Sequence, residues 1–112
     1  IISIESTSFV NHFINDRKSD FKIYLTKIAH KSTGNHYSSS VVNSYSSQIN
    51  SCGKYYGVDL WKIENVMKMT EFYSKIEKDS YFLQKDKDSN KALSNGLKRY
   101  KEFLEYQENQ QQ

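Results

Sequence analysis

NKALSNGLKRYKEFL, residues 90–104, is the stretch of this chain that most clearly predicts its fold. Its apolar residues follow the positions i, i+4, i+7, i+10 and i+11, which lie on one face of an α-helix. They are Leu93, Leu97, Tyr100, Phe103 and Leu104. Ser89 or Asn90 is expected to open this helix, and the polar residues from Tyr106 onward are expected to fray. A long amphipathic helix therefore closes the chain.

A serine-rich segment in the middle of the chain keeps the same helical repeat. Seven of the fourteen residues in 38–51 are serine. The apolar positions are Val41, Val42, Tyr45, Ile49, Cys52 and Tyr56, and Gly57 can supply a C-terminal cap. Because serine is an indifferent helix former, packing must hold this helix. A serine-rich face favours close approach to a hydrogen-bonding partner, with compositional drift as the alternative, and the sequence leaves both open.

Weaker helical signals precede and follow these two segments. The residues Phe21, Tyr24, Leu25 and Ile28 predict a helix capped by Ser19 or Asp20, and Phe9, Val10, Phe13 and Ile14 predict a short one before it. Residues 30–36 are predicted to form a loop in which Gly34 or Asn35 has a left-handed backbone. Residues 58–69 are predicted to form a connector in which Trp61 is buried. The helix that follows is predicted to be capped by Thr70 and to bury Phe72, Tyr73 and Ile76. A mixed-charge loop is expected between that helix and the last one.

The composition supports a small all-α domain. The chain has 112 residues, no proline and four glycines, which are few turn residues for a β-rich fold. We therefore predict a single bundle of four main helices plus a short N-terminal one, spanning 1–108 with its core in 19–106, and a polar tail at 109–112. One cysteine excludes an internal disulfide, and no apolar run approaches the roughly 18 residues of a membrane span. The start at Ile1 and the lack of a signal peptide predict a segment of a longer, cytoplasmic protein.

Charge is segregated along the chain, although the net charge is only +3. No acidic residue lies between Asp20 and Asp59, and the basic residues of the last helix all precede Glu102. The cations of these two regions are Lys22, Lys27, Lys31, Lys54, Lys91, Lys98, Arg99 and Lys101. A protein that neutralises phosphates favours such segregation, whereas solvated lysines are the alternative. We expect the two regions to converge into one positively charged wall.

The final helix resembles the last helix of the core-binding, SAM-like domain of tyrosine recombinases and phage integrases. The matching residues are Asn90, Lys91, Leu93, Ser94, Leu97, Tyr100 and Leu104. FKIYL (21–25) and YSSSVVNSYSSQI (37–49) resemble the first and second helices of that domain. The module is also similar to the N-terminal region of bacterial restriction proteins that carry an HNH nuclease or an McrB-like motor. The resemblance covers about residues 19–106.

The resemblance implies a bundle that clamps one side of duplex DNA. The helix bearing Ser38–Ser51 and the last helix would face the grooves. Two features depart from the family pattern. Gly96 stands where the family prefers alanine, which costs about 1 kcal/mol of helix propensity or permits close approach of another helix. The loop at 30–37 is longer than the usual turn.

Residues for catalysis are absent from the predicted pattern. A recombinase needs paired arginines and a late tyrosine in a separate domain, and this chain has only Arg17 and Arg99. His12, His30 and His36 lack metal-ligand spacing, and Cys52 lies on an apolar stripe. The carboxylate pairs Asp16/Asp20 and Glu77/Asp79 lie in charged surface stretches, which is poor support for a metal nuclease. We expect no enzymatic activity, no metal and no cofactor.

The sequence thus predicts a non-catalytic module that binds double-stranded DNA. The expected phosphate contacts are Lys31, Lys54, Lys91, Lys98 and Arg99, and the expected base-edge or water-mediated contacts are Ser38, Ser39, Asn43, Ser44, Ser94 and Asn95, with His36 beside them. Tyr37, Tyr55 and Tyr56 are candidates to stack on exposed bases, with packing as the alternative. The alternative function is a protein–protein or homo-oligomer module. It requires an exposed aromatic patch formed by Tyr24, Tyr37, Tyr55, Tyr73 and Tyr81.

Overall fold

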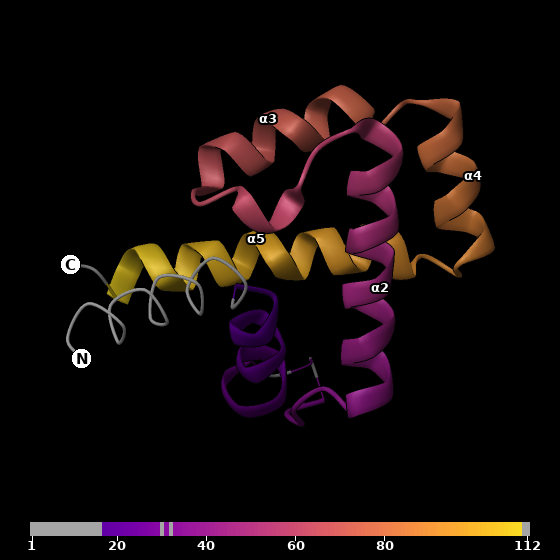
Figure 1. The fold of residues 1–112 in the computed structure, drawn as a ribbon. Coiled ribbons are helices and arrows are strands. Elements are labelled where there is room, and N and C mark those ends of the chain that lie inside the picture. The colour runs from indigo at the N-terminus through magenta and orange to yellow at the C-terminus, as the bar shows by residue number, and fades with distance from the viewer. Residues whose placement is uncertain (1–16, 30, 32, 111–112) are drawn as a thin grey trace, which may run out of the picture.

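The computed structural model describes residues 17–29, 31 and 33–110, and all the regular elements in this part of the chain are helical (Figure 1). Residues 17–23 are α-helical and continue into η1 (Tyr24–Ile28), one turn of π-helix. The other elements are α2 (Ser39–Tyr56), the 3₁₀ turn η2 (Leu60–Lys62), α3 (Val66–Ile76), α4 (Ser80–Asp88) and α5 (Ala92–Gln110). The predicted all-α class is confirmed. The short helix predicted at Phe9–Ile14 lies outside the described residues.

Helix α5 forms the centre of the bundle. Figure 1 shows α2 lying steeply across it, with α3 and the helix at 17–28 on opposite sides of it. The residues that α5 buries include all five of its predicted apolar positions. Helix α4 connects α3 back to the start of α5. Because α5 touches α2, α3 and α4, its apolar face is the surface on which the fold assembles.

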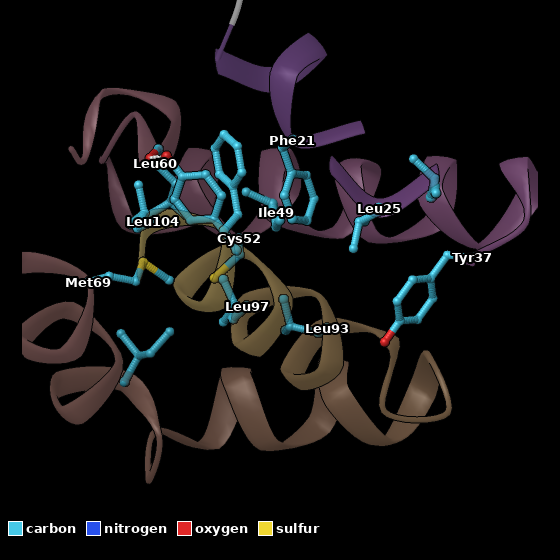
Figure 2. Packing of buried hydrophobic residues seen from close by; sticks show 14 of the residues in the cluster. Phe21, Leu25, Tyr37, Ile49, Cys52, Leu60, Met69, Leu93, Leu97 and Leu104 are labelled. Carbon is cyan, nitrogen blue, oxygen red and sulfur yellow. Dashed lines mark hydrogen bonds between the residues drawn. The ribbon is translucent and has the colours of Figure 1, made fainter. Parts of the chain in front are cut away.

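The core is rich in aromatic rings that meet edge to face. Phe21 is fully buried, and its ring centroid lies 5.5 Å from that of Tyr100 and 5.8 Å from that of Phe103. Figure 2 shows Leu93 and Leu97 on the side of α5 that faces Cys52 of α2. Edge-to-face ring pairs add to the free energy that area burial supplies. Phe21 and Tyr24, whose ring lies 5.5 Å from that of Phe103, therefore hold the helix at 17–28 against α5.

Both ends of α2 form as the sequence predicts. The Ser38 hydroxyl accepts a hydrogen bond from the Val41 N–H at 3.4 Å, and Ser38 is the N-cap. Gly57 ends the helix with a φ of 72°, a left-handed conformation that glycine adopts without steric cost. The described residues of the predicted loop, 31 and 33–36, are not helical, and Gly34 there has a φ of 91°. These two termini define the length of α2, which packs against α5.

Two small residues let α2 and α5 approach closely. A Cβ atom added to Gly96 would lie 3.3 Å from the Cα, Cβ and backbone oxygen of Tyr45. Ser46 is 1% exposed, and its hydroxyl has no hydrogen-bond partner among the described residues. A hydroxyl buried without a partner contributes no stability through hydrogen bonding. The contribution of Ser46 to the crossing is therefore its small size, as it is for Gly96.

The connector between α2 and α3 is tied to α5 by one hydroxyl. Tyr100 is fully buried, and its hydroxyl donates to the backbone oxygens of Leu60 at 2.9 Å and of Ile63 at 3.0 Å. Arg17 Nη1 also donates to the Trp61 backbone oxygen at 2.6 Å. Trp61 is half-buried rather than buried as predicted, because its indole N–H reaches outward to the Asn50 side-chain oxygen.

The structure places several helix boundaries differently from the sequence prediction. Helix α3 begins at Val66, where the Asn65 side-chain oxygen accepts from the Lys68 N–H at 2.8 Å, so Thr70 lies inside the helix. Ser19 and Asp20 do not cap a helix, because the chain is already helical at Arg17. The apolar pattern alone therefore does not locate these boundaries. At α3 the boundary is set by the capping side chain of Asn65.

The predicted mixed-charge loop contains a helix. Helix α4 buries Phe82, whose ring meets Tyr73 of α3 edge to face at 5.7 Å. Tyr81 of the same helix stacks on Tyr55 of α2, and the Asp86 carboxylate accepts from the Ser94 N–H at 2.8 Å, so contacts with three helices anchor α4 although most of its residues are polar. Ser89 accepts from the Leu93 N–H at 3.2 Å, so it caps α5 as predicted, although Asn90 and Lys91 first adopt positive φ values of 55° and 68°.

The predicted frayed tail is helical as far as Gln110. The Glu108 carboxylate accepts from the Val66 N–H at 3.2 Å, and Tyr106 packs against Tyr24 at 5.2 Å between ring centroids. Both contacts reach residues far away in the sequence, so tertiary packing extends this helix. None of the helices in the described part of the chain has the length and apolar character that crossing a bilayer requires.

Enlarging Gly96 should separate α2 from α5. Gly96→Val is expected to lower the free energy of unfolding by about 1–3 kcal/mol, because a branched side chain cannot fit against the Tyr45 backbone. Ser46→Ala, at the same crossing, is expected to cause no loss, because it removes a hydroxyl that has no partner. Urea denaturation followed by circular dichroism compares the two variants. A Gly96→Val variant as stable as the parent would contradict the close crossing.

Removing the Tyr100 hydroxyl should loosen the connector between α2 and α3. Tyr100→Phe is expected to cost about 1–3 kcal/mol, because the Ile63 backbone oxygen loses this donor and the Leu60 backbone oxygen keeps only the Ile63 N–H. Tyr106→Phe serves as the matched control, since Tyr106 contributes a ring contact with Tyr24. Thermal denaturation of both variants measures the difference. Equal melting temperatures for the two would show that the hydroxyl does not hold the connector.

Candidate nucleic-acid interface

The face of α2 that points away from α5 is polar along its whole length. Its exposed residues recur at i, i+4, i+7, i+11 and i+14, and they are Ser40, Ser44, Ser47, Ser51 and Lys54, with Asn43 beside them. We call this set the outer face of α2. The opposite side buries Val42, Ser46, Ile49, Cys52 and Gly53. The serine-rich half of the helix is thus exposed to solvent, apart from Ser46.

The outer face of α2 has no carboxylate on its own segment. The residues from Phe21 to Val58, which build η1, the loop and α2, include no aspartate or glutamate. Lys27 and Lys54 are exposed in this region, and Lys31 is half-buried. The nearest carboxylates come from other elements, such as Asp88, which lines a groove with Ser51. A surface of this kind attracts anions, because no like-charged group on the same segment opposes their approach.

The loop before α2 is held by short-range hydrogen bonds. The Lys31 N–H donates to the Asn35 backbone oxygen at 2.8 Å, and the Gly34 N–H donates to the Lys31 backbone oxygen at 2.8 Å. His36 is exposed, and its Nδ1 lies 2.6 Å from the Ala29 backbone oxygen. Because that oxygen only accepts, Nδ1 carries the proton. The predicted contacts Lys31 and His36 therefore lie on an ordered loop, next to the exposed Ser38 and Ser39.

The basic residue Lys98 of α5 lies on the other side of the molecule. It is exposed and stands two residues after Gly96, which faces α2. Two residues along an α-helix correspond to a rotation of about 200°, so Lys98 points away from α2. The outer face of α2 in turn points away from α5. The single positively charged wall expected from the sequence does not form, because the two helices pack through the faces opposite to Lys54 and Lys98.

The exposed side of α5 also differs from the prediction in its charge. Glu102 and Glu105 are exposed one and two turns after Lys98, which makes this surface mixed rather than basic. Arg99 donates through Nη2 to the Glu102 carboxylate at 2.7 Å and through Nη1 to the Tyr37 hydroxyl at 3.2 Å. Burial opposes its charged form, but these two partners outweigh burial and raise the pKa of Arg99. Its charge therefore joins α5 to the segment before α2.

Two further predicted DNA contacts on α5, Ser94 and Asn95, are buried and half-buried. Ser94 is 8% exposed, its hydroxyl donates to the Lys91 backbone oxygen at 3.3 Å, and its N–H donates to the Asp86 carboxylate at 2.8 Å. This burial corrects the expectation that Ser94 reaches a base edge. Asn95 is half-buried beside it. Of the twelve predicted contact residues, those on α2 and its preceding loop share one region. Arg99 reaches this region through the Tyr37 hydroxyl, whereas Lys98 points away from it.

Sequence reasoning missed Ser40, Ser47 and Ser51, which the outer face includes. Their spacing from Ser44 and Lys54 was available in the sequence. It marks the stripe opposite to Val42 and Ile49, which the apolar pattern had already assigned to the core. A complete helical projection of residues 38–57 would have identified the whole face.

The five tyrosines proposed for a protein-binding patch are dispersed. Tyr37 is buried, Tyr24 packs between Phe103 and Tyr106, and Tyr73 packs against Phe82. Only Tyr55 is largely exposed, and its ring is stacked on that of Tyr81. These five tyrosines therefore do not form the exposed aromatic patch that would favour a protein–protein module. Three of them pack within the domain, and Tyr55 and Tyr81 form a stacked pair.

The side chains considered above as metal ligands or catalytic groups do not form a site in the described residues. Asp79 accepts from the Tyr56 hydroxyl at 2.6 Å, and burial is the largest of the effects that raise the pKa of that hydroxyl. No three histidine, cysteine, aspartate or glutamate side chains in the described residues gather to hold a metal. His12, Asp16 and His30 lie outside those residues.

No protein-family model, curated protein or solved structure matches the chain. The resemblance to core-binding domains therefore stays a prediction, and function has to be argued from the surfaces described above.

The Cys52 thiol should be inert in the folded protein. It is 2% exposed, and burial raises its pKa to about 11, so almost no thiolate forms at neutral pH. Reaction with a chromogenic disulfide reagent is expected to be slow at neutral pH and to become fast when the protein is unfolded in denaturant. Fast reaction of the folded protein would show that Cys52 is accessible and that α2 opens at this position.

Proposed function

We propose that this chain is a non-catalytic DNA-binding module of a larger bacterial DNA-processing protein, such as a restriction system or a site-specific recombinase. The module binds duplex DNA through the outer face of α2 and the loop that precedes it. This proposal keeps the partner predicted from the sequence and narrows the surface to one side of the molecule.

One observation carries the proposal: the outer face of α2 is exposed, and the segment from Phe21 to Val58 that builds it contains no aspartate or glutamate. Exposed lysines lie near both ends of this region, Lys27 in η1 and Lys54 in the last turn of α2. Pairing of lysines with phosphates releases counterions, and this release supplies most of the affinity of non-specific DNA binding. Serine and asparagine side chains between the lysines can donate to phosphate oxygens.

The N-terminus of α2 supports the same orientation. Ser38, Ser39 and Ser40 are all exposed there, and the first N–H groups of a helix have no partner within it. The helix dipole places a partial positive charge at this end, which favours a phosphate. A duplex lying along α2 would therefore meet hydrogen-bond donors at the start of the helix and Lys54 near its end.

The expected sequence preference is weak. Hydroxyl groups contact phosphate or either type of base pair, so serines discriminate little between sequences. Asn43 is the one residue of the outer face whose carboxamide can form a bidentate contact with adenine in the major groove. Affinity is therefore expected to depend on salt much more than on sequence.

Charge reversal on the two sides of the molecule tests the surface. Lys54→Glu is expected to weaken binding of a fluorescent duplex by about tenfold or more and to make the salt slope shallower by about 1, because one phosphate contact is lost. Lys98→Glu changes the net charge equally but lies on the opposite side, so the affinity should change little. Fluorescence anisotropy at about 50 and about 200 mM salt provides both values.

Three results would contradict the proposal. The first is the absence of duplex binding at the lower salt concentration, and the second is binding that does not weaken at the higher one. The third is equal loss of affinity in Lys54→Glu and Lys98→Glu, which would show that net charge rather than the outer face of α2 governs binding.

A further inference from the structure

A rigid pair of tyrosines stands where α2 ends and α4 begins. The rings of Tyr55 and Tyr81 are parallel to within 3°, with centroids 3.4 Å apart. Tyr56 meets both rings edge to face, at 4.9 Å from Tyr55 and 5.9 Å from Tyr81. The Tyr56 hydroxyl donates to Asp79 at 2.6 Å, which fixes the ring that supports the pair. The stack is therefore held in place by contacts from three elements.

The outer ring of this pair is open to solvent. Tyr55 is 56% exposed, and within the described residues its ring contacts are with Tyr56 and Tyr81. Tyr81 covers one face of the Tyr55 ring. The separation of the two rings equals the rise of about 3.4 Å per base along a DNA strand. A nucleobase placed on the free face of Tyr55 would continue the stack at its natural spacing.

The pair lies at the end of a stripe on α2. Ser44, Gln48, Ser51 and Tyr55 follow the positions i, i+4, i+7 and i+11, so they line one side of the helix. Ser44 and Ser51 belong to the outer face for which we propose phosphate contacts. A strand that follows this face toward the C-terminus of α2 would thus arrive at Tyr55.

A groove beside the pair offers a cation and polar groups. It has a volume of about 170 Å³ and is lined by Gln48, Ser51 and Lys85 together with Tyr81. Lys85 Nζ lies 5.8 Å from the centre of the Tyr81 ring. Asp88 also lines the groove, but its carboxylate accepts from Gln84 Nε2 at 2.8 Å. Lys85 can therefore neutralise the phosphate of a nucleotide that is stacked nearby.

We infer that the Tyr55–Tyr81 pair stacks on an unpaired base, so that the module prefers DNA in which a single-stranded extension follows the duplex. Within a duplex both faces of every internal base are covered by neighbouring bases, so an unpaired base can occupy the free face of Tyr55 whereas an internal paired base cannot. Aromatic stacking tolerates every base, and the preference is accordingly for strandedness rather than sequence. The inference rests on the proposed function, because the duplex along α2 delivers the extension to the pair.

The test compares two hairpins with the same stem, one blunt and one with a short single-stranded extension, offered in both polarities. The hairpin with the extension is expected to bind at least about fivefold more tightly in one polarity, as stacking of one base predicts. Tyr55→Ala should abolish this gain, and Tyr55→Phe should keep it, because the ring and not the hydroxyl stacks. Met67→Ala, which truncates an exposed side chain on α3, should leave the gain unchanged.

A second measurement reports stacking directly. 2-Aminopurine in the extension is expected to lose fluorescence on binding to the parent protein and to Tyr55→Phe, but not on binding to Tyr55→Ala. Thermal denaturation of each variant confirms that the fold is retained. An extension that brings no gain in either polarity, or a gain that survives in Tyr55→Ala, would overturn the inference.

The results separate this inference from the function on which it rests. If the blunt hairpin binds in a salt-dependent manner and the extension adds nothing, the proposed function stands and the stacking role is wrong. If only the hairpin with the extension binds, the stacking role stands and duplex binding along α2 is wrong. If neither hairpin binds, both are wrong.

Discussion

The close crossing of α2 and α5 is the constraint on which the rest of the structure depends. At this crossing Gly96 leaves room for the backbone of Tyr45, and Ser46 adds little volume. Larger residues at these two positions would hold the helices apart, and the contacts of Leu93 and Leu97 with Ile49 and Cys52 would weaken. Gly96, which costs helix propensity in α5, is thus the same residue that permits the crossing.

The crossing also decides which sides of the two helices are exposed. Because α2 uses its apolar side against α5, its serines and Lys54 point outward, away from the core. Lys98 points outward from α5 in the opposite direction. The chain therefore has a face on α2 whose own segment contains no carboxylate and a mixed-charge face on α5, where Glu102 and Glu105 accompany the lysine. This asymmetry is what directs the proposed DNA contact to α2.

Aromatic residues serve two purposes in this small domain. Phe21, Tyr100 and Phe103 fill the centre, where their large buried area compensates for a low content of aliphatic side chains. The Tyr100 hydroxyl additionally satisfies two carbonyls of the connector. Tyr55 and Tyr81, by contrast, form a stack at the surface. A preformed stack loses little conformational entropy on binding, which is why an exposed pair suits a planar ligand.

The sequence by itself determined α2, α5 as far as Glu105 and the loop around Gly34. Strong periodicity and capping residues such as Ser38 and Gly57 are local properties of the chain, and they survived folding unchanged. The sequence could not place the start of α3 or reveal α4, because contacts with other helices, such as Phe82 with Tyr73 and Tyr81 with Tyr55, make helix favourable in that polar stretch. Nor could it show that the two basic regions face opposite ways. A list of charges fixes how many cations each helix has, whereas their direction in space depends on which side of each helix is buried, and tertiary packing alone decides that.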